Sequence, residues 1–327
     1  MYTREANKED TEDGRWLMIL QTGMRTDIPA FYSEWFCNRI KEGYVYVRNP
    51  YNPQSVTAYR IHPDVVDLIS FCTKNPAPML EHMELLAPYG QYWFVTITSY
   101  GQEIEPGVPA KECVMEDFKR LSEKVGVDSV GWRYDPIFVW EEYTVERHIA
   151  DFEQMARTLA GYTRTCVISF IDLYQKVRKN FPEVGAVSRE QRLQMGKAFA
   201  EIGRKYDMTI KGCGEGQELA QFGVDCNGCM TLETFACALH ESLNVPRWKP
   251  AREECACFLG NDIGAYNTCG HLCRYCYANH DEEIVRRNLR AHRPQAPLLI
   301  GNIHPEDTIT WAKQESWRDG QMRLEFL

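Results

Sequence analysis

Short apolar runs alternate with amphipathic segments through the first two hundred residues of the chain. The apolar runs, which are typical of buried strands, are Leu17–Gln21, Val66–Phe71, Trp93–Thr98, Val130–Phe138, Cys166–Ile171 and Met208–Lys211. Helical spacing of apolar residues occurs in Pro29–Lys41, Lys111–Val125, Val145–Leu159 and Ser188–Tyr206. Repeated β–α alternation is typical of a parallel sheet. The sequence therefore predicts an α/β fold, a complete or partial TIM-type (β/α) barrel.

The chain changes character after residue 212. Residues 1–212 carry the alternation and are expected to form the barrel scaffold, whereas residues 213–327 are irregular and rich in cysteine. We expect the second part to be a cap packed on the barrel mouth, within one structural unit. A barrel with insertions accommodates a chain of 327 residues in a single domain.

Charge and hydropathy narrow the function classes. The formal charge of −9 argues against broad, salt-driven binding to nucleic acid or anionic membranes, although a locally basic cleft remains compatible with it. The segment Met1–Arg15 is polar and has no apolar core of a signal peptide. The apolar run Trp16–Leu20 is too short to cross a bilayer. The expectation is a cytoplasmic protein with no membrane association.

The 13 cysteines are unevenly distributed. Five are isolated in apolar or helical stretches: Cys37, Cys72, Cys113, Cys166 and Cys237. The remaining eight form two groups between residues 213 and 276. In a reducing compartment, clustered thiols are more often metal ligands or catalytic groups than disulfides.

The first group is Cys269, Cys273 and Cys276, with the spacing Cys-x3-Cys-x2-Cys. Soft thiolate ligands favour iron–sulfur or zinc centres, and three ligands leave one metal position open for reaction. The structural alternative is a zinc knuckle that takes a fourth ligand from His271 or a distant cysteine, although His271 fits better as a residue supporting the ligands.

With Tyr275 before its last cysteine, this loop resembles the cluster loop of radical S-adenosylmethionine enzymes. The resemblance implies a [4Fe-4S] cluster, S-adenosylmethionine as cofactor, and an electron donor such as flavodoxin or ferredoxin. The position of the loop departs from the pattern of that superfamily. This difference affects the assignment of S-adenosylmethionine more than the assignment of the cluster. Members of that superfamily usually carry the loop after the first strand, whereas here it lies near the C-terminus.

The second group offers more thiols than one metal centre requires. It comprises Cys213, Cys226, Cys229, Cys255 and Cys257. The preferred ligand set for a second cluster is Cys213, Cys226, Cys255 and Cys257, because Cys213 ends a predicted strand, and Cys229 is then the spare thiol. Zinc is the main alternative metal at this second site.

Polar residues follow each of six successive apolar runs. Because active sites of barrel enzymes form at the C-terminal ends of the strands, these polar residues are candidates for a shared site. The candidate catalytic residues are Arg25, Asp27, Lys74, Arg133, Asp135 and Asp172. The candidate cofactor-binding residues are Asn75, Glu215, Tyr275 and Tyr277. The competing interpretations are ordinary loop polarity, a structural ion pair between Arg133 and Asp135, and packing for the two tyrosines.

Four further stretches carry a second resemblance: Arg25–Tyr32, Thr73–Pro76, Trp132–Ile137 and Asp262–Asn279. They resemble a bacterial family known only as a domain of unknown function with a cysteine-rich C-terminus. That family is distantly similar to spore photoproduct lyase and other barrel-type radical enzymes. One departure is Cys72, which stands where related sequences tend to have Trp. The resemblance supports the fold and the cluster but names no substrate.

The leading hypothesis is a radical S-adenosylmethionine enzyme that acts on a small-molecule, peptide or nucleic-acid substrate at the barrel mouth. Two alternatives remain open. The first is a non-catalytic metal-binding or electron-transfer protein with structural zinc or iron–sulfur sites. The second is a lyase that repairs nucleic-acid lesions.

Overall fold

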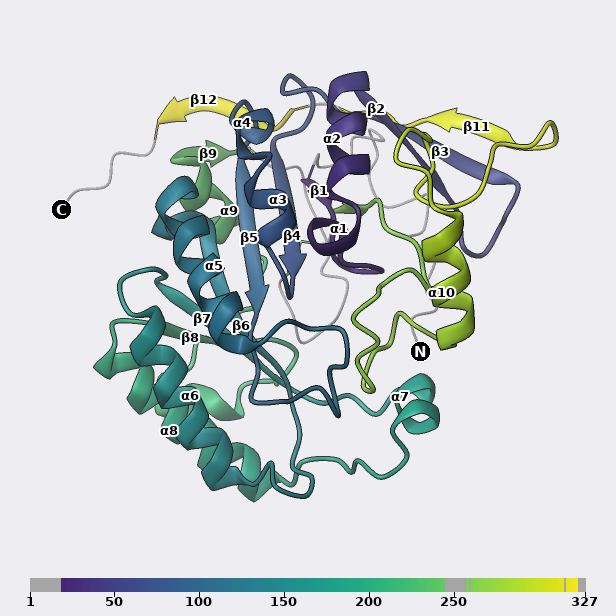
Figure 1. The fold of residues 1–327 in the computed structure, drawn as a ribbon. Helices are drawn as coiled ribbons and strands as arrows, with labels where there is room; N and C mark the ends of the chain where they lie inside the picture. The colour runs from purple at the N-terminus through teal and green to yellow at the C-terminus, as the bar shows by residue number, and fades with distance from the viewer. Residues whose placement is uncertain (1–18, 245–256, 259, 315, 323–327) are drawn as a thin grey trace.

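A seven-stranded parallel sheet organises the chain in a computed structural model, which describes residues 19–244, 257–258, 260–314 and 316–322 (Figure 1). The strand order is β10-β1-β4-β5-β6-β7-β8, and every neighbouring pair is parallel. In chain order the strands are β1 (Ile19–Gln21), β4 (Leu68–Thr73), β5 (Gln91–Thr96), β6 (Val130–Ile137), β7 (Thr165–Phe170), β8 (Thr209–Gly212) and β10 (Asn261–Asp262).

This sheet confirms the predicted α/β class and the parallel arrangement. Each predicted strand overlaps one of β1, β4, β5, β6, β7 and β8. Among the described residues β10 and β8 are the outer strands of the sheet. Closure into a barrel stays a prediction.

Helices lie between the strands of the main sheet along the chain, and the last helix follows the last of these strands. They are α1 (Ile28–Phe31), α2 (Ser33–Glu42), α3 (Ala77–Leu80), α4 (Met83–Leu86), α5 (Lys111–Val125), α6 (Val145–Leu159), α7 (Gln175–Asn180), α8 (Arg189–Lys205), α9 (Leu232–Leu239) and α10 (Glu282–Ala291). Two short 3₁₀ turns, η1 (Val127–Ser129) and η2 (Glu218–Phe222), complete the set. Helices α5 and α6 have the predicted bounds. Polar caps define the starts of two helices: Thr144 accepts the Arg147 N–H before α6, and Ser188 forms a capping box with Gln191 before α8.

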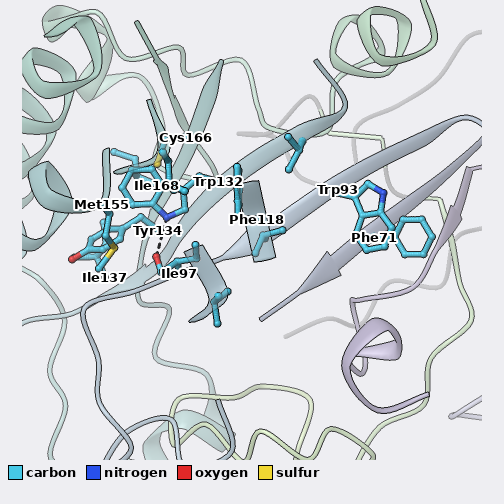
Figure 2. Close-up of a cluster of buried hydrophobic side chains, with 14 of the residues drawn as sticks. Phe71, Trp93, Ile97, Phe118, Trp132, Tyr134, Ile137, Met155, Cys166 and Ile168 are labelled. Atoms are coloured by element: carbon cyan, nitrogen blue, oxygen red, sulfur yellow. Dashed lines mark hydrogen bonds between the residues drawn. The ribbon is translucent and has the colours of Figure 1, made fainter. Parts of the chain in front are cut away.

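One face of the sheet carries the larger core. Alternate strand residues point to the same face, which brings Phe71, Trp93 and Trp132 together. Phe71 and Trp93 stack with their ring centroids 3.8 Å apart, and the Trp132 indole donates to the Ile97 carbonyl at 3.0 Å (Figure 2). Phe152 of α6 stacks on Trp132 with a centroid distance of 4.6 Å. This aromatic layer fixes the helices against the sheet.

The opposite face has a smaller core that includes cysteines. Leu68, Phe94 and Val167 from the strands pack with Cys229 and Cys257 from outside the sheet. Phe235 of α9 and Phe258 belong to the same cluster. The described part of the C-terminal region therefore covers this face of the sheet, whereas the arrangement of residues 213–327 as a cap over a barrel mouth stays a prediction.

Two small sheets lie beside the main one. Strands β2 (Tyr44–Arg48) and β3 (Ser55–Arg60) pair antiparallel, and β11 (Thr308–Trp311) pairs parallel with β3. Strand β9 (Glu241–Leu243) pairs antiparallel with β12 (Arg318–Met322). None of these strands was predicted from the sequence. Their stability depends on partners far away along the chain, which local periodicity does not reveal.

Candidate metal centres

Three thiols from the second cysteine group meet on the smaller core face. Cys213 follows β8, Cys229 precedes α9, and Cys257 comes from a third segment. The Cys229 sulfur lies 3.5 Å from the Cys213 sulfur and 3.6 Å from the Cys257 sulfur. All three sulfur atoms lie within 4.8 Å of one another. This trio could hold a metal ion.

Backbone groups support the sulfur of Cys257. The N–H groups of Cys229 and Met230 both donate to it, at 3.2 and 3.4 Å. Hydrogen bonds of this kind stabilise the thiolate form, which is the form that binds metal. Cys229 and Cys257 are buried, so an incoming metal ion would lose most of its water at this position.

The trio differs from the ligand set expected from the sequence. Cys226 was expected among the ligands and Cys229 was expected to be spare, but the structure places Cys229 in the group. Cys226 is buried nearby, where its thiol donates to the Val224 carbonyl at 3.6 Å. The turn Cys226–Cys229 thus presents its second sulfur to Cys213. Cys255 lies outside the described residues.

The first cysteine group forms a loop near the C-terminal ends of the strands. Burial raises the pKa of the Cys269 thiol well above its usual value, and the nearby Asp27 carboxylate adds to this shift. Cys273 and Cys276 also contribute, so both lie close to Cys269. A turn brings the Cys276 N–H to the Cys273 carbonyl at 3.0 Å. Its backbone includes a left-handed residue, Leu272, with φ of 55°. These sulfurs do not form a group as tight as the trio within the described part of the chain.

This loop is anchored to the sheet through His271. The His271 ring contacts the Asp27 carboxylate at 2.8 Å and the Gly107 carbonyl at 3.0 Å. These two contacts hold the ring between the segment after β1 and the loop before α5. His271 therefore supports the loop. Asp27 is fixed in turn, because it caps α1 through the Ala30 N–H and accepts the Lys74 N–H.

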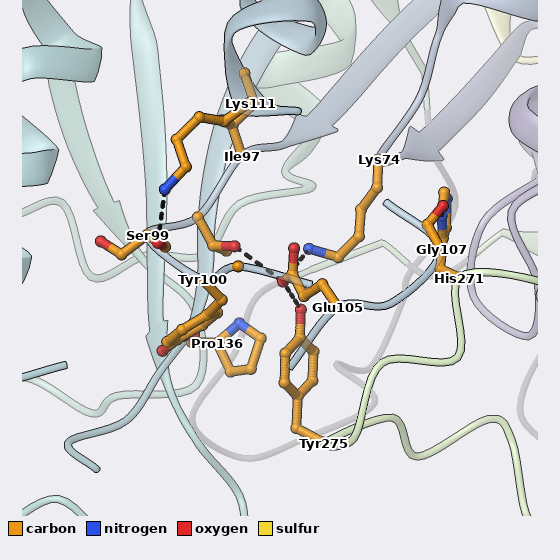
Figure 3. Close-up of polar contacts among 12 residues, drawn as sticks. Lys74, Ile97, Ser99, Tyr100, Glu105, Gly107, Lys111, Pro136, His271 and Tyr275 are labelled. Atoms are coloured by element: carbon orange, nitrogen blue, oxygen red, sulfur yellow. Dashed lines mark hydrogen bonds and ion pairs between the residues drawn. The ribbon is translucent and has the colours of Figure 1, made fainter. Parts of the chain in front are cut away.

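Glu105 connects this loop to two strand ends. One of its carboxylate oxygens accepts hydrogen bonds from Lys74 at 2.9 Å, from Thr98 at 2.9 Å and from the Tyr275 hydroxyl (Figure 3). Glu105 is buried. Burial lowers the pKa of Lys74, but the charges of Glu105 and Cys273 outweigh burial and raise it. Lys74 is therefore a fixed cation beside the cysteine loop.

Arg133 and Asp135 lie near the trio. Their side chains form an ion pair, as the structural alternative proposed. Burial lowers the pKa of Arg133, but Asp135, Cys72, Cys229 and Cys213 together raise it well above its usual value. Burial raises the pKa of Asp135, with Arg133 opposing. A charged pair is thus positioned next to the trio.

The structure gives structural partners to three of the other predicted residues. Arg25 pairs with Asp262 at 2.5 Å, Asn75 accepts the Ala77 N–H at the start of α3, and the exposed Asp172 accepts the Tyr174 hydroxyl at 2.7 Å.

Glu215 and Tyr277 are also bonded to nearby groups. Glu215 accepts the Phe170 N–H at 2.7 Å, and burial raises its pKa to about 7. Tyr277 is exposed and donates to the Met24 carbonyl at 2.5 Å. Of the predicted polar residues, the structure therefore brings Asp27, Lys74, Arg133, Asp135 and Tyr275 around the cysteines.

Two residues near the cysteines are not indicated as site residues by local sequence patterns. Sequence patterns do not indicate Glu105, because it lies nine positions after the end of β5, in a loop that local patterning treats as solvent-exposed. Cys229 was rated as spare because sequence spacing does not show which sulfur of a turn points inward. The available signal for Glu105 is the polar Thr98 at the end of a predicted strand.

A cavity of about 200 Å³ opens beside Glu105. It lies between the loop after β5 and the start of α5, and Thr98, Tyr100, Glu105 and Lys111 contribute to its lining. The Lys111 ammonium donates to the Ser99 carbonyl at 2.6 Å (Figure 3). The cavity is smaller than most ligand sites, so it accommodates a small molecule or one part of a larger one.

Comparison with known protein families supplies the classification. The family model described as "Domain of unknown function (DUF1848)" matches residues 19–278. The chain belongs to this family. The match covers the main sheet and both cysteine groups, and it confirms the expected resemblance to an uncharacterised family. No curated protein matches the chain.

The likeness to spore photoproduct lyase stays a prediction for this member of the DUF1848 family. The same holds for the expected electron donor and for the cytoplasmic location. Every helix in the described residues is too short or too polar to span a lipid bilayer.

Proposed function

We propose that this DUF1848 protein is an iron–sulfur enzyme of the radical S-adenosylmethionine type, with Cys269, Cys273 and Cys276 as the cluster ligands. The observation that carries the proposal is the convergence of three buried or half-buried thiols with Lys74 at the strand ends. A [4Fe-4S] cluster bound there would supply an electron to cleave S-adenosylmethionine at its open iron.

The donor set fits such a cluster. Each thiolate of a cubane binds a different iron, so its sulfurs stand farther apart than the ligands of a single ion, in line with the looser spacing of this loop. The Ala278 N–H donates to the Cys276 sulfur at 3.3 Å, which stabilises its thiolate. Lys74 adds positive charge near Cys273. Metal binding must displace the protons of these thiols, because burial raises the pKa of each.

The surrounding residues orient and shield the site. Glu105 fixes the direction of Lys74 and of the Tyr275 ring, and Asp27 fixes the loop through His271. The cavity beside Glu105 offers a polar pocket next to this network. We propose that it receives part of the substrate or cofactor, with Thr98 and Glu105 available as hydrogen-bond partners.

Anaerobic reconstitution tests the proposal. We expect the full chain to bind iron and sulfide and to form 5′-deoxyadenosine when a reductant and S-adenosylmethionine are added. Cys273→Ser should lose the iron and the product, whereas Cys113→Ser, at an exposed and isolated thiol, should keep both. A fully loaded cluster that leaves S-adenosylmethionine intact would contradict the enzymatic proposal. Protein containing only zinc would favour the non-catalytic metal-binding alternative.

A further inference from the structure

We propose that Cys213, Cys229 and Cys257 bind a single zinc ion, at a site separate from the cysteine loop at residues 269–276. The distances between the sulfur atoms carry this inference. Zinc–sulfur bonds of about 2.3 Å in tetrahedral geometry place two sulfurs about 3.8 Å apart. The observed separations from Cys229 are 3.5 and 3.6 Å. The trio is therefore already arranged for one ion, and its sulfurs are too close together to bind different irons of a cubane.

A disulfide is a poorer explanation of the trio. The Cys229 sulfur is almost equally distant from both partners, whereas a disulfide would bring one of them to about 2.05 Å and leave the other thiol alone. The two N–H groups that donate to Cys257 also favour a thiolate. Both observations match a metal-bound sulfur, which keeps its negative charge and its acceptor capacity.

The charges around the trio suit a thiolate-bound ion. Three thiolates and one divalent ion leave a net negative charge, and Arg133 supplies a cation near Cys213 and Cys229. The Arg133 Nε atom is buried and has no hydrogen-bond partner among the described residues. An anionic zinc–thiolate centre would give this guanidinium a favourable neighbour.

The binding step is an exchange of protons for metal. Zinc exchanges three of its bound waters for three sulfur bonds, one with each cysteine, and keeps a water as its fourth ligand, while three thiol protons pass to the solvent. No electron is transferred, since zinc is redox-inert.

The position of the site indicates a structural role. Cys213 follows β8, Cys229 lies before α9, and Cys257 belongs to a segment that packs on the same face of the sheet. One ion would tie these three segments together beside Phe94 and Val167. It would also hold the end of β8 next to Asp135, whose pKa responds to Cys213.

The full chain, purified with added zinc and then dialysed, should retain one zinc per chain. Replacing zinc with Co²⁺ should give the intense visible bands of a tetrahedral cobalt–thiolate centre. Cys229→Ser and Cys257→Ser should weaken binding by at least ~10-fold, since loss of a ligand should exceed the loss typical of a supporting residue. Cys226→Ser is the matched control, because it removes a buried neighbouring thiol that is outside the trio.

The outcomes separate this inference from the proposed function. Cys273→Ser should keep zinc while losing iron, and Cys229→Ser should do the reverse. The inference is overturned if Cys226→Ser loses the metal while Cys229→Ser keeps it, if the trio variants lose iron and sulfide in place of zinc, or if cobalt gives a weak octahedral spectrum. The cobalt spectrum is measured on the unmodified chain. It therefore tests the inference even if a cysteine variant does not fold.

Discussion

The carboxylate of Glu105 shows how a single residue connects distant parts of this chain. Three side chains donate to one of its oxygens, and they come from the segment after β4, from the segment after β5 and from the cysteine loop. The buried ion pair with Lys74 has a side-chain exposure of 13% for Lys74 and 5% for Glu105. At that depth, removal of one partner leaves an uncompensated charge.

Glu105→Gln should therefore lower the free energy of unfolding by about 2–4 kcal/mol. The amide oxygen still accepts a hydrogen bond, but it no longer balances the charge of Lys74. Urea denaturation measures the change. Glu112→Gln, an exposed position in α5, is the control and should shift stability by less than ~0.5 kcal/mol. Equal stability of the two variants would show that Lys74 finds sufficient compensation elsewhere.

His148 is a second buried residue whose protonation state is fixed by its partners. Its Nε2–H donates to the Phe138 carbonyl at 2.8 Å, and Nδ1 accepts the Tyr134 hydroxyl at 2.7 Å. The neutral ring makes both of these hydrogen bonds. Burial lowers the pKa of His148, while the Phe138 carbonyl and Asp151 raise it and Arg147 lowers it.

Stability should consequently fall as the pH decreases through and below 6.5. In that range the unfolded chain takes up a proton at His148 that the folded chain does not, whereas above it both forms are neutral. In His148→Gln the slope of unfolding free energy against pH should decrease, by up to about 1.4 kcal/mol per pH unit. Denaturation at pH 5.5 and 7.5 measures this slope. His62→Gln, at an exposed ring, should leave it unchanged.

At the scale of elements, close contact between β1 and β4 depends on a glycine. Gly23 follows β1, and a Cβ atom there would lie 2.3 Å from the Cys72 carbonyl oxygen and 2.4 Å from the Cys72 Cβ. Backbone atoms cannot move away as a flexible side chain can. This approach lets the segment after β1, with Arg25 and Asp27, lie beside the end of β4.

Gly23→Ala should destabilise the fold by about 1–3 kcal/mol, because the methyl group must displace the end of β4. It should also weaken the Asp27–His271 contact, and with it metal loading of the 269–276 loop. Thermal denaturation and iron content report the two effects. Gly185→Ala, where a Cβ meets nothing within 4 Å, is the matched substitution and should change neither property. Normal stability in Gly23→Ala would mean that β1 and β4 separate at little cost.

At the scale of the whole molecule, the cysteine trio joins segments that are far apart in sequence. Cys213 and Cys257 are separated by 44 positions, yet both contact Cys229. A ligand that binds only the folded chain stabilises it through mass action, by about 3 kcal/mol when its concentration is one hundred times Kd.

Removal of zinc with a chelator should therefore lower the melting temperature of the full chain, and added zinc should restore it. Cys229→Ser should start from the lower value and respond to neither treatment. Differential scanning calorimetry measures both. If zinc does not change the melting temperature of the unmodified chain, the prediction is wrong. The apolar residues on this face of the sheet would then account for its stability without a metal ion.

Local patterns were sufficient for the elements of the main sheet. The apolar runs predicted β4 to β8, and the helical spacing predicted the bounds of α5 and α6, because these elements bury a continuous face and the residues themselves encode its period. The small sheets were not predicted, since β3 and β11 pair across about 250 residues and each is weakly apolar alone.

The sequence by itself determined the α/β class and the two cysteine groups, because periodicity and spacing are properties of neighbouring residues. It also determined the family to which the chain belongs. Only the tertiary structure decided that Cys229 replaces Cys226 in the trio, that Glu105 holds Lys74, and that Arg133 stands next to the sulfurs. Those outcomes depend on which atoms meet when distant segments pack. Distances in space, set by the burial of shared apolar surface, decide which side chains meet.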